Sequence, residues 1–486
     1  MTAALAGVVG YLALGTLSLL GGGRYLGVLA WTLGTGVLLL WAPGFAESTL
    51  GVGSWGIRLA GDGVAVAFWA LALILHGTIL WGEWKRTGAF HPLVTLLFGT
   101  TLALVLSRDL FNLYVCLELT SLLSFLLVGY ESRPGSVWAS LQYLILTTVG
   151  MILYLVGLGL VYGCLGTLSL GEIARLSPSL SDPALAVGVG LLLSGAAVKG
   201  GVFLLGLWLP QAHGRAPSSV SALLSGLVVK MGIVALLRIG EAFAVGQVLV
   251  ALGLVTGFGS LIYALWERDI KFFLAYSTMS QLGYLLVGFG LGGGAAFGAL
   301  LYALAHGLFK ALLFLSAGEA IAEAGTRRIA GLAGRLSWGT ALALAVGTWA
   351  IVGLPPLPGF VAKGVLTQGA PPYVKWALFA LGVGTAAAFT KLLPLLRPGA
   401  RGTLWKGGLP LVLALLAFGG WGLATGPGLL SSWTWGRSVL AVVLGIGLGW
   451  LAGHVRPWLP RLTLDRAALA ILVSALGIAF GLVLRM

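Results

Sequence analysis

The chain has 486 residues, of which 59% are hydrophobic and only 9% are charged. Soluble domains carry about 25% charged residues, so this composition excludes a soluble globular enzyme, a disordered chain and a nucleic-acid-binding protein. The net charge of +14 is then explained by basic loops that fix the topology of a membrane protein. The composition therefore predicts a polytopic membrane protein. A span needs about 20 apolar residues, so a chain of this length has room for many spans, and the all-α class follows from the segments below.

Sixteen apolar segments are predicted as membrane-spanning helices, because the runs are continuous and do not alternate with period two. In chain order they are residues 3–20, 25–41, 64–81, 93–106, 110–130, 137–163, 185–209, 218–239, 245–266, 272–291, 295–317, 336–367, 374–393, 409–423, 439–454 and 467–484. The first is expected to be a retained span, since it lacks the basic region of a signal peptide. Asp62 and Asp109 start two of the spans, where a carboxylate favours the helix N-terminus.

The basic residues between the spans predict an orientation. Sixteen of them fall in the odd-numbered loops and seven in the even-numbered loops and the C-terminus. Because cytoplasmic loops carry the excess of Lys and Arg, both termini are predicted to lie outside the cell. The remaining five cations lie inside apolar runs, and all five are lysines: Lys199, Lys230, Lys310, Lys363 and Lys391. A buried lysine can release its proton, whereas arginine effectively cannot.

Glu118 lies in the middle of an apolar span, where an acid is costly. One interpretation is a packing carboxylate that bonds to a neighbouring helix. The functional interpretation is a counter-ion for a buried lysine on a proton path. Lys230 and Lys391 have a simpler alternative, because a lysine near a helix end can extend its amine to the membrane surface.

Two of the lysines lie beside Pro/Gly-rich interruptions of an apolar segment. Lys199 is followed by Pro210 and Pro217, and Lys363 is preceded by Pro355, Pro356 and Pro358. Such paired breaks are typical of transporters built from inverted repeats. We therefore expect repeats of five helices at residues 90–240 and 241–395, with N-terminal helices at 1–89 and C-terminal helices at 396–486.

Other polar residues in the spans have competing interpretations. His306 and Lys310 are four residues apart and share one helix face, so they could relay a proton or could be helix contacts. Ser277, Gln281 and Tyr284 form one stripe, which could line water or join helices. Cys116 and Cys164 are expected to be packing residues. No cluster of His, Cys and carboxylates suggests a metal, and no cofactor motif is seen.

Several stretches together resemble the antiporter-like subunits of respiratory complex I and of the multisubunit Mrp cation/proton antiporters. They are Leu117–Leu119, Lys199 with Trp208–His213, Ala216–Leu224, Val229–Lys230, Asp269–Tyr284, His306–Leu315 and Gly353–Lys363. The resemblance implies a fourteen-helix core with two inverted five-helix repeats, followed here by about two extra C-terminal helices. It also implies that Glu118 pairs with Lys199, that Lys230 is the connecting lysine, and that His306 and Lys310 lead to Lys363.

The resemblance further implies a proton-translocating subunit of a cation (Na⁺)/proton antiporter in a prokaryotic cytoplasmic membrane. Its partners would be other membrane subunits, H⁺ with Na⁺ or K⁺, and lipid, with no nucleic acid and no cofactor. The chain is most similar to the Mrp D-type subunit, because it has a lysine at 363 and no long C-terminal extension. A subunit of complex I or of a membrane hydrogenase is the alternative, and a stand-alone solute transporter is a more distant one.

Overall fold

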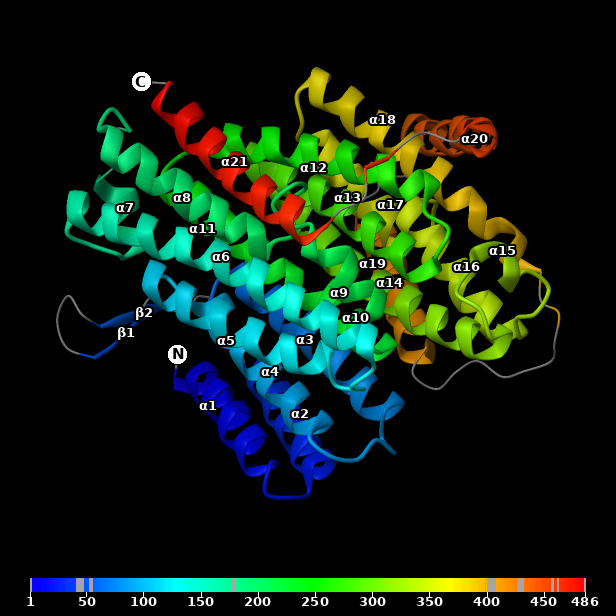
Figure 1. Ribbon diagram of the computed structural model, residues 1–486, viewed down its shortest axis with the longest axis horizontal. Coiled ribbons are helices and arrows are strands. Elements are labelled where there is room, and N and C mark those ends of the chain that lie inside the picture. Colours follow the sequence, from blue (N-terminus) through cyan, green and yellow to red (C-terminus); the bar gives the residue numbers. More distant parts are fainter. Residues whose placement is uncertain are drawn as a thin grey trace. The chain divides into compact units, whose positions relative to one another are not determined.

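The computed structural model is almost entirely helical (Figure 1). It describes residues 2–40, 48–51, 56–176, 180–397, 399, 408–425, 432–455, 459–460 and 463–484. Eleven helices in this part of the chain are long and apolar enough to cross a membrane, and shorter apolar helices accompany them. The predicted all-α membrane fold is therefore confirmed, whereas the count of sixteen spans stays a prediction.

The chain divides into two units, each assembled from more than one stretch of sequence. Unit 1 contains residues 1–208, 227–246 and 462–486. Its helices are α1 (Thr2–Leu17), α2 (Gly23–Leu39), α3 (Gly63–Gly82), α4 (Phe90–Leu106), α5 (Leu110–Val128), α6 (Pro134–Leu165), α7 (Leu170–Leu176), α8 (Pro183–Lys199), α11 (Val229–Ala242) and α21 (Leu464–Val483). Two short strands, β1 (Ser48–Leu50) and β2 (Ile57–Leu59), form an antiparallel hairpin that the sequence did not predict.

Unit 2 contains residues 209–226 and 247–461. Its α-helices are α9 (Trp208–Arg215), α10 (Ser218–Leu223), α12 (Gly246–Trp266), α13 (Ile270–Leu291), α14 (Gly293–Ala324), α15 (Ile329–Leu332), α16 (Trp338–Val352), α17 (Pro358–Gln368), α18 (Pro372–Phe389), α19 (Gly408–Thr425) and α20 (Ser432–His454). A π-helix, η2 (Leu224–Val228), follows α10, and a 3₁₀ helix, η3 (Thr390–Leu396), follows α18. No observation tests the four predicted domains at residues 1–89, 90–240, 241–395 and 396–486.

The same local design occurs once in each unit. In unit 1, α5 begins at Asp109, whose carboxylate accepts two backbone N–H groups of the first turn, and the 32-residue α6 ends at left-handed Gly166. In unit 2, α13 begins in the same way at Asp269, and the 32-residue α14 ends at left-handed Gly325. A short helix follows each long one, and an isolated β-bridge joins the entry of that helix to the capping aspartate.

Carboxylate capping explains where several helices start. Asp62 accepts the backbone N–H of Ala65 at 3.0 Å, and Asp109 accepts that of Asn112 at 2.9 Å. A capping side chain satisfies amide groups that have no partner inside the helix. The prediction that Asp62 and Asp109 stabilise helix N-termini is confirmed.

Two predicted spans are each divided into two helices. The segment 185–209 breaks after Lys199, where glycines 200, 201 and 206 lie between α8 and α9, and Gly201 has a φ of 66°. The segment 336–367 breaks between α16 and α17, where Gly353 has a φ of 89°. Glycine tolerates such left-handed backbone, so these residues allow the chain to leave the helix.

The two C-terminal helices pack on different units. In unit 1, α21 lies along α8 and also contacts α6 (Figure 1). The contact with α8 is close, because a Cβ added at Gly190 would lie 2.6 Å from the Cα of Ala479. In unit 2, α20 packs on α18, and the indole of Trp266 donates to the carbonyls of Ala452 and Val455 at 3.0 Å. These two helices are therefore integral parts of the two units.

The predicted orientation depends partly on residues that the structure does not describe. Five of the counted loop and terminal cations lie outside the described residues: Arg401, Lys406, Arg456, Arg461 and Arg485. The sides on which the termini lie therefore stay a prediction.

Candidate functional site

Glu118 and Lys199 form an ion pair inside unit 1. The Nζ of Lys199 lies 3.1 Å from Oε1 of Glu118, and it donates to the hydroxyl of Ser121 at 2.6 Å. The lysine side chain is only 4% exposed, while that of Glu118 is 33% exposed. The pair therefore joins a buried amine to a carboxylate side chain that is partly exposed on the surface of the chain. Ser121, one turn beyond Glu118 on α5, had no predicted role.

Lys230 lies on the helix that packs against the end of α8. It is the second residue of α11, directly after the π-helix η2, and its side chain is fully buried. A π-turn is rare and is frequently found at functional sites. A Cβ added at Gly232 would lie 2.1 Å from the backbone nitrogen of Gly200. The backbones that follow Lys199 and Lys230 therefore touch without intervening side chains.

Lys310 and His306 lie on α14, inside unit 2. Both side chains are fully buried. The Nζ of Lys310 donates to the carbonyl of Leu274 at 2.9 Å and to the hydroxyl of Ser277 at 2.5 Å. The ring of His306 lies among aromatic rings, with that of Tyr302 6.3 Å away between centroids. Lys310 is thus connected to the polar stripe of α13.

Lys363 lies on α17, one turn and a half after the broken segment. Its Nζ donates to the carbonyl of Ile351 at 2.7 Å, near the end of α16. The same Nζ lies 4.9 Å from the ring centroid of Tyr284 and 5.5 Å from that of Tyr302. The amine is held by a helix-end carbonyl and lies beside two aromatic rings.

A row of polar groups runs along α13 and α14 between Lys310 and Lys363. Ser277 accepts from Lys310. One helical turn further, the hydroxyl of Tyr302 donates to Oε1 of Gln281 at 2.5 Å, and the amide of Gln281 donates to Thr385 at 3.1 Å. Within the predicted stripe, Ser277 contacts Lys310, the ring of Tyr284 lies beside Lys363, and Gln281 bonds to Tyr302 and Thr385. Tyr302 and Thr385 were missed, because a single hydroxyl in an apolar helix has no distinctive sequence pattern.

The prolines that were expected at the helix breaks occupy different positions. Pro210 lies within the first turn of α9, and Pro217 precedes α10. Pro355 and Pro356 lie in the break between α16 and α17, and Pro358 is the first residue of α17. The glycines after Lys199, rather than Pro210, form the break that follows it.

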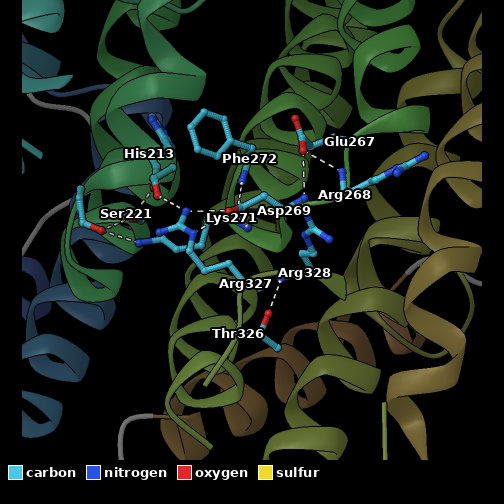
Figure 2. Close-up of polar contacts among 12 residues, drawn as sticks. His213, Ser221, Glu267, Arg268, Asp269, Lys271, Phe272, Thr326, Arg327 and Arg328 are labelled. Atoms are coloured by element: carbon cyan, nitrogen blue, oxygen red, sulfur yellow. Dashed lines mark hydrogen bonds and ion pairs between the residues drawn. The ribbon is translucent and has the colours of Figure 1, made fainter. Parts of the chain in front are cut away.

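A charged cluster holds the turn between α9 and α10 against the start of α13 (Figure 2). Arg327 donates to Asp269 at 2.6 Å through Nε and at 3.1 Å through a terminal nitrogen, and also to the carbonyl of Gly214 at 2.5 Å. The buried Lys271 donates to the carbonyl of Ala216 at 2.5 Å. Two cations therefore satisfy carbonyls that the broken helix leaves without helical partners. The hydroxyl of Ser221 in turn donates to the carbonyl of His213 at 2.8 Å.

Lys391 occupies a helix-end position rather than the polar row. Its Nζ donates to the carbonyls of Ala264, Leu265 and Glu267 at 2.7, 3.0 and 3.0 Å. These carbonyls belong to the C-terminal end of α12 and the residues after it, where a cation is favourable. The arrangement gives Lys391 a structural role.

A second charged cluster lies in unit 1, at the start of α3. Asp62 accepts from Arg238 at 2.9 Å and pairs with Arg108 at 2.9 Å. Partial burial opposes ionisation of Asp62. The hydrogen bond and the charge of Arg238, with the charge of Arg108, outweigh it and lower the pKa of the carboxyl to about 2. Asp62 is therefore both a helix cap and the centre of an ion-pair cluster.

Comparisons with known proteins identify the family of this chain. Membrane helices that are interrupted part-way along their length are typical of the class of secondary transporters. Residues 107–390 match the family NADH:quinone oxidoreductase/Mrp antiporter, transmembrane, and the chain belongs to this family.

Two relatives and one solved structure illustrate the range of the family. The chain is 34% identical over 382 residues to the N-type subunit of the NADH-quinone oxidoreductase of Desulforudis audaxviator, covering 71% of this chain and 75% of the relative. It is 30% identical over 369 residues to the D-type subunit of the Na(+)/H(+) antiporter of Alkalihalophilus pseudofirmus, covering 71% and 74%. A chain of respiratory complex I from Thermus thermophilus matches with a TM-score of 0.75 and 25% identity, covering 92% of this chain and 99% of that one.

Proposed function

We propose that this chain is a proton-translocating subunit of a multisubunit cation/proton antiporter, with Na⁺ as the first candidate cation. Protons would move along Glu118, Lys199, Lys230, His306, Lys310 and Lys363. The observation that carries the proposal is the ion pair of Glu118 with the shielded Lys199, at 3.1 Å. A desolvated amine held by one carboxylate changes its proton affinity when that carboxylate is neutralised or attracted elsewhere.

The mechanism assigns a separate task to each unit. In unit 1, Glu118 holds Lys199 protonated until a charge on an adjoining subunit draws the carboxylate away, and Lys199 then passes its proton toward Lys230. In unit 2, His306 and Lys310 pass the proton to Lys363. The hydrogen bond that Tyr302 donates to Gln281 supports this step, because protons move along connected polar groups and water.

The alternative is an antiporter-like subunit of complex I or of a membrane-bound hydrogenase. The relative from a NADH-quinone oxidoreductase supports it as directly as the relative from a Na(+)/H(+) antiporter supports the first proposal. Both proposals share the proton path and require other membrane subunits as partners. A stand-alone solute transporter is the more distant alternative, and it requires no partner.

Co-purification followed by transport separates these functions. The tagged chain is isolated in mild detergent from its native host, and the assembly that co-purifies is reconstituted into vesicles with an internal pH dye. An Na⁺ or K⁺ gradient that drives proton movement supports the antiporter, while proton movement only upon NADH or hydrogen oxidation supports the alternative. A chain that purifies alone and binds a solute in a fixed ratio would contradict both.

We also propose a prokaryotic cytoplasmic membrane, with both termini outside. Lys85 follows α3 and Lys375 lies in the first turn of α18, at two helix ends that are predicted to face opposite sides of the membrane. A Lys85→Cys variant is expected to react with an impermeant thiol reagent from inside only, and a Lys375→Cys variant from outside only. Labelling of both from the same side would contradict this topology.

A further inference from the structure

A cationic cavity lies between α17, α18 and α20 of unit 2. Its volume is about 320 Å³. Three basic side chains line it, one from each helix: Lys363, Lys375 and Arg437. The hydroxyls of Thr367 and Ser438 add further polar groups. A cavity that collects three cations in one small volume is costly, because like charges repel.

Nothing in the described part of the chain neutralises these charges. Among the described residues that line the cavity, none is acidic. The ion pairs formed by the described residues do not include Lys363, Lys375 or Arg437. Arg437 instead lies over the ring of Phe379, with 5.9 Å between its guanidinium carbon and the ring centroid. The cavity therefore has the charge and the donors for an anion.

Part of the cavity lining lies where three helices begin or end. Gln368, which lines the cavity, is the last residue of α17, Lys375 is in the first turn of α18, and Arg437 is near the start of α20. Tyr373 and Trp376 next to Lys375 are 63% and 71% exposed. Exposed Tyr and Trp at helix ends are typical of the level of lipid headgroups.

We propose that this cavity binds the phosphate group of an anionic phospholipid. The guanidinium of Arg437 and the amine of Lys375 match a phosphate in charge and hydrogen bonding. Beyond Arg437, α20 exposes the apolar side chains of Val439, Leu440 and Val443, along which an acyl chain can lie. A free phosphate has the same headgroup chemistry and lacks this apolar contact.

The bound phosphate would place a fixed negative charge in the cavity that Lys363 lines. It would favour the protonated form of that lysine, as an opposite charge does. The site thus concerns lipid binding and stands independently of the assembly to which the chain belongs.

The test is lipid binding to the full chain, measured by native mass spectrometry in detergent with phosphatidylglycerol or phosphatidylcholine added. Phosphatidylglycerol is expected to bind preferentially. The Lys375→Gln/Arg437→Gln double variant is expected to bind it about tenfold more weakly, since two charge-assisted contacts are lost. The matched control is Lys85→Gln/Arg175→Gln, which removes two exposed cations of unit 1 and is expected to bind as the parent does.

Three results would overturn the proposal. Equal binding of both lipids would mean that the cavity does not select an anionic phospholipid, because both lipids carry a phosphate and only phosphatidylglycerol has a net negative charge. Unchanged phosphatidylglycerol binding in the double variant would place the lipid elsewhere. Displacement of the lipid by millimolar inorganic phosphate would assign the cavity to a soluble anion. Thermal unfolding of each variant shows whether it is folded, and Arg437→Lys, which keeps the charge, is expected to retain binding if the double variant unfolds.

Discussion

Gly232 of α11 packs directly against Gly200, the residue that follows Lys199. A Cβ at position 232 would lie 2.1 Å from the backbone nitrogen of Gly200 and 2.5 Å from its Cα. Real Cβ atoms do not approach backbone atoms this closely, so only glycine fits at this crossing. The contact places the backbone at the end of α8 directly against that at the start of α11, and each of these helices carries a buried lysine.

Replacing Gly232 by valine is expected to separate α8 from α11. The backbone has to move, because the atoms in the way belong to the main chain. We expect a loss of about 1–3 kcal/mol of stability, as in other overpacked sites, and a loss of proton transport. Thermal unfolding and vesicle transport measure the two effects.

Gly420→Val is the control for this substitution. Gly420 also lies in a helix, and nothing lies within 4 Å of a Cβ placed there. Stability and transport close to those of the parent are expected. A Gly232→Val variant that also behaves like the parent would show that the close crossing is not required.

Removing either member of the Glu118–Lys199 pair is expected to abolish proton transport. Lys199→Ala deletes the amine that carries the proton, and Glu118→Gln keeps the shape of the side chain but removes its charge. Proton-transfer groups commonly contribute about 100-fold or more to a rate. Transport by the purified assembly in vesicles is the measurement, and co-purification of partners shows that assembly is intact. An intact assembly with Lys199→Ala that transports at the parental rate would exclude this path.

Tyr302→Phe is expected to slow transport without unfolding unit 2. The substitution removes one hydroxyl and its 2.5 Å bond to Gln281, while the aromatic face near Lys363 remains. A fall of about tenfold corresponds to the loss of one strong hydrogen bond. Tyr162→Phe, on the exposed side of α6, is the control and is expected to leave the rate unchanged. If both variants transport equally well, the row between Lys310 and Lys363 is not used.

The ion-pair cluster at Asp62 predicts how stability depends on pH. The pKa of Asp62 is lowered from 3.8 to about 2 in the folded chain. The stabilisation is therefore fully present above about pH 4 and is lost as the pH falls toward about 2, where the folded carboxyl takes up its proton. Thermal unfolding of the parent and of Asp62→Asn should differ most near neutral pH. The difference is expected to disappear at the acidic end, and a difference independent of pH would contradict the assignment.

Lys391→Met is expected to destabilise the chain without interrupting the proton path. The amine donates to three carbonyls at the end of α12, and leaving such groups unsatisfied costs about 1–3 kcal/mol. Thermal unfolding is expected at a lower temperature than for Lys85→Met, which replaces an exposed lysine. Loss of transport at parental stability would instead assign Lys391 to the path.

The sequence was sufficient for the fold class and for the residues of one ion pair. Continuous apolar runs predict helices because the bilayer core contains no water, so the backbone N–H and C=O groups of each run must bond to one another. Glu118 and Lys199 were distinctive because charged groups are rare at that depth, although their pairing came from the resemblance to a family.

The remaining features depend on contacts between distant segments. The partners of Gln281 are hydroxyls of Tyr302 and Thr385, and neither has a recognisable pattern of its own. Asp62, Arg108 and Arg238 are far apart in the chain, and the sequence indicates only a helix start and two loop cations. Lys391 was ambiguous for the same reason, since the carbonyls that it contacts carry no sequence signature.

The packing of α21 along α8 has a consequence for synthesis. The helix that carries Lys199 is made early and packs on α6 and α11, yet one of its faces is covered by a helix that is made more than 250 residues later. During translation this surface of α8 stays open to lipid or to a membrane chaperone until α21 has left the ribosome. A chain truncated before Leu464 would therefore expose the lysine-bearing helix, and quality-control proteases would have a means to distinguish unfinished copies from finished ones.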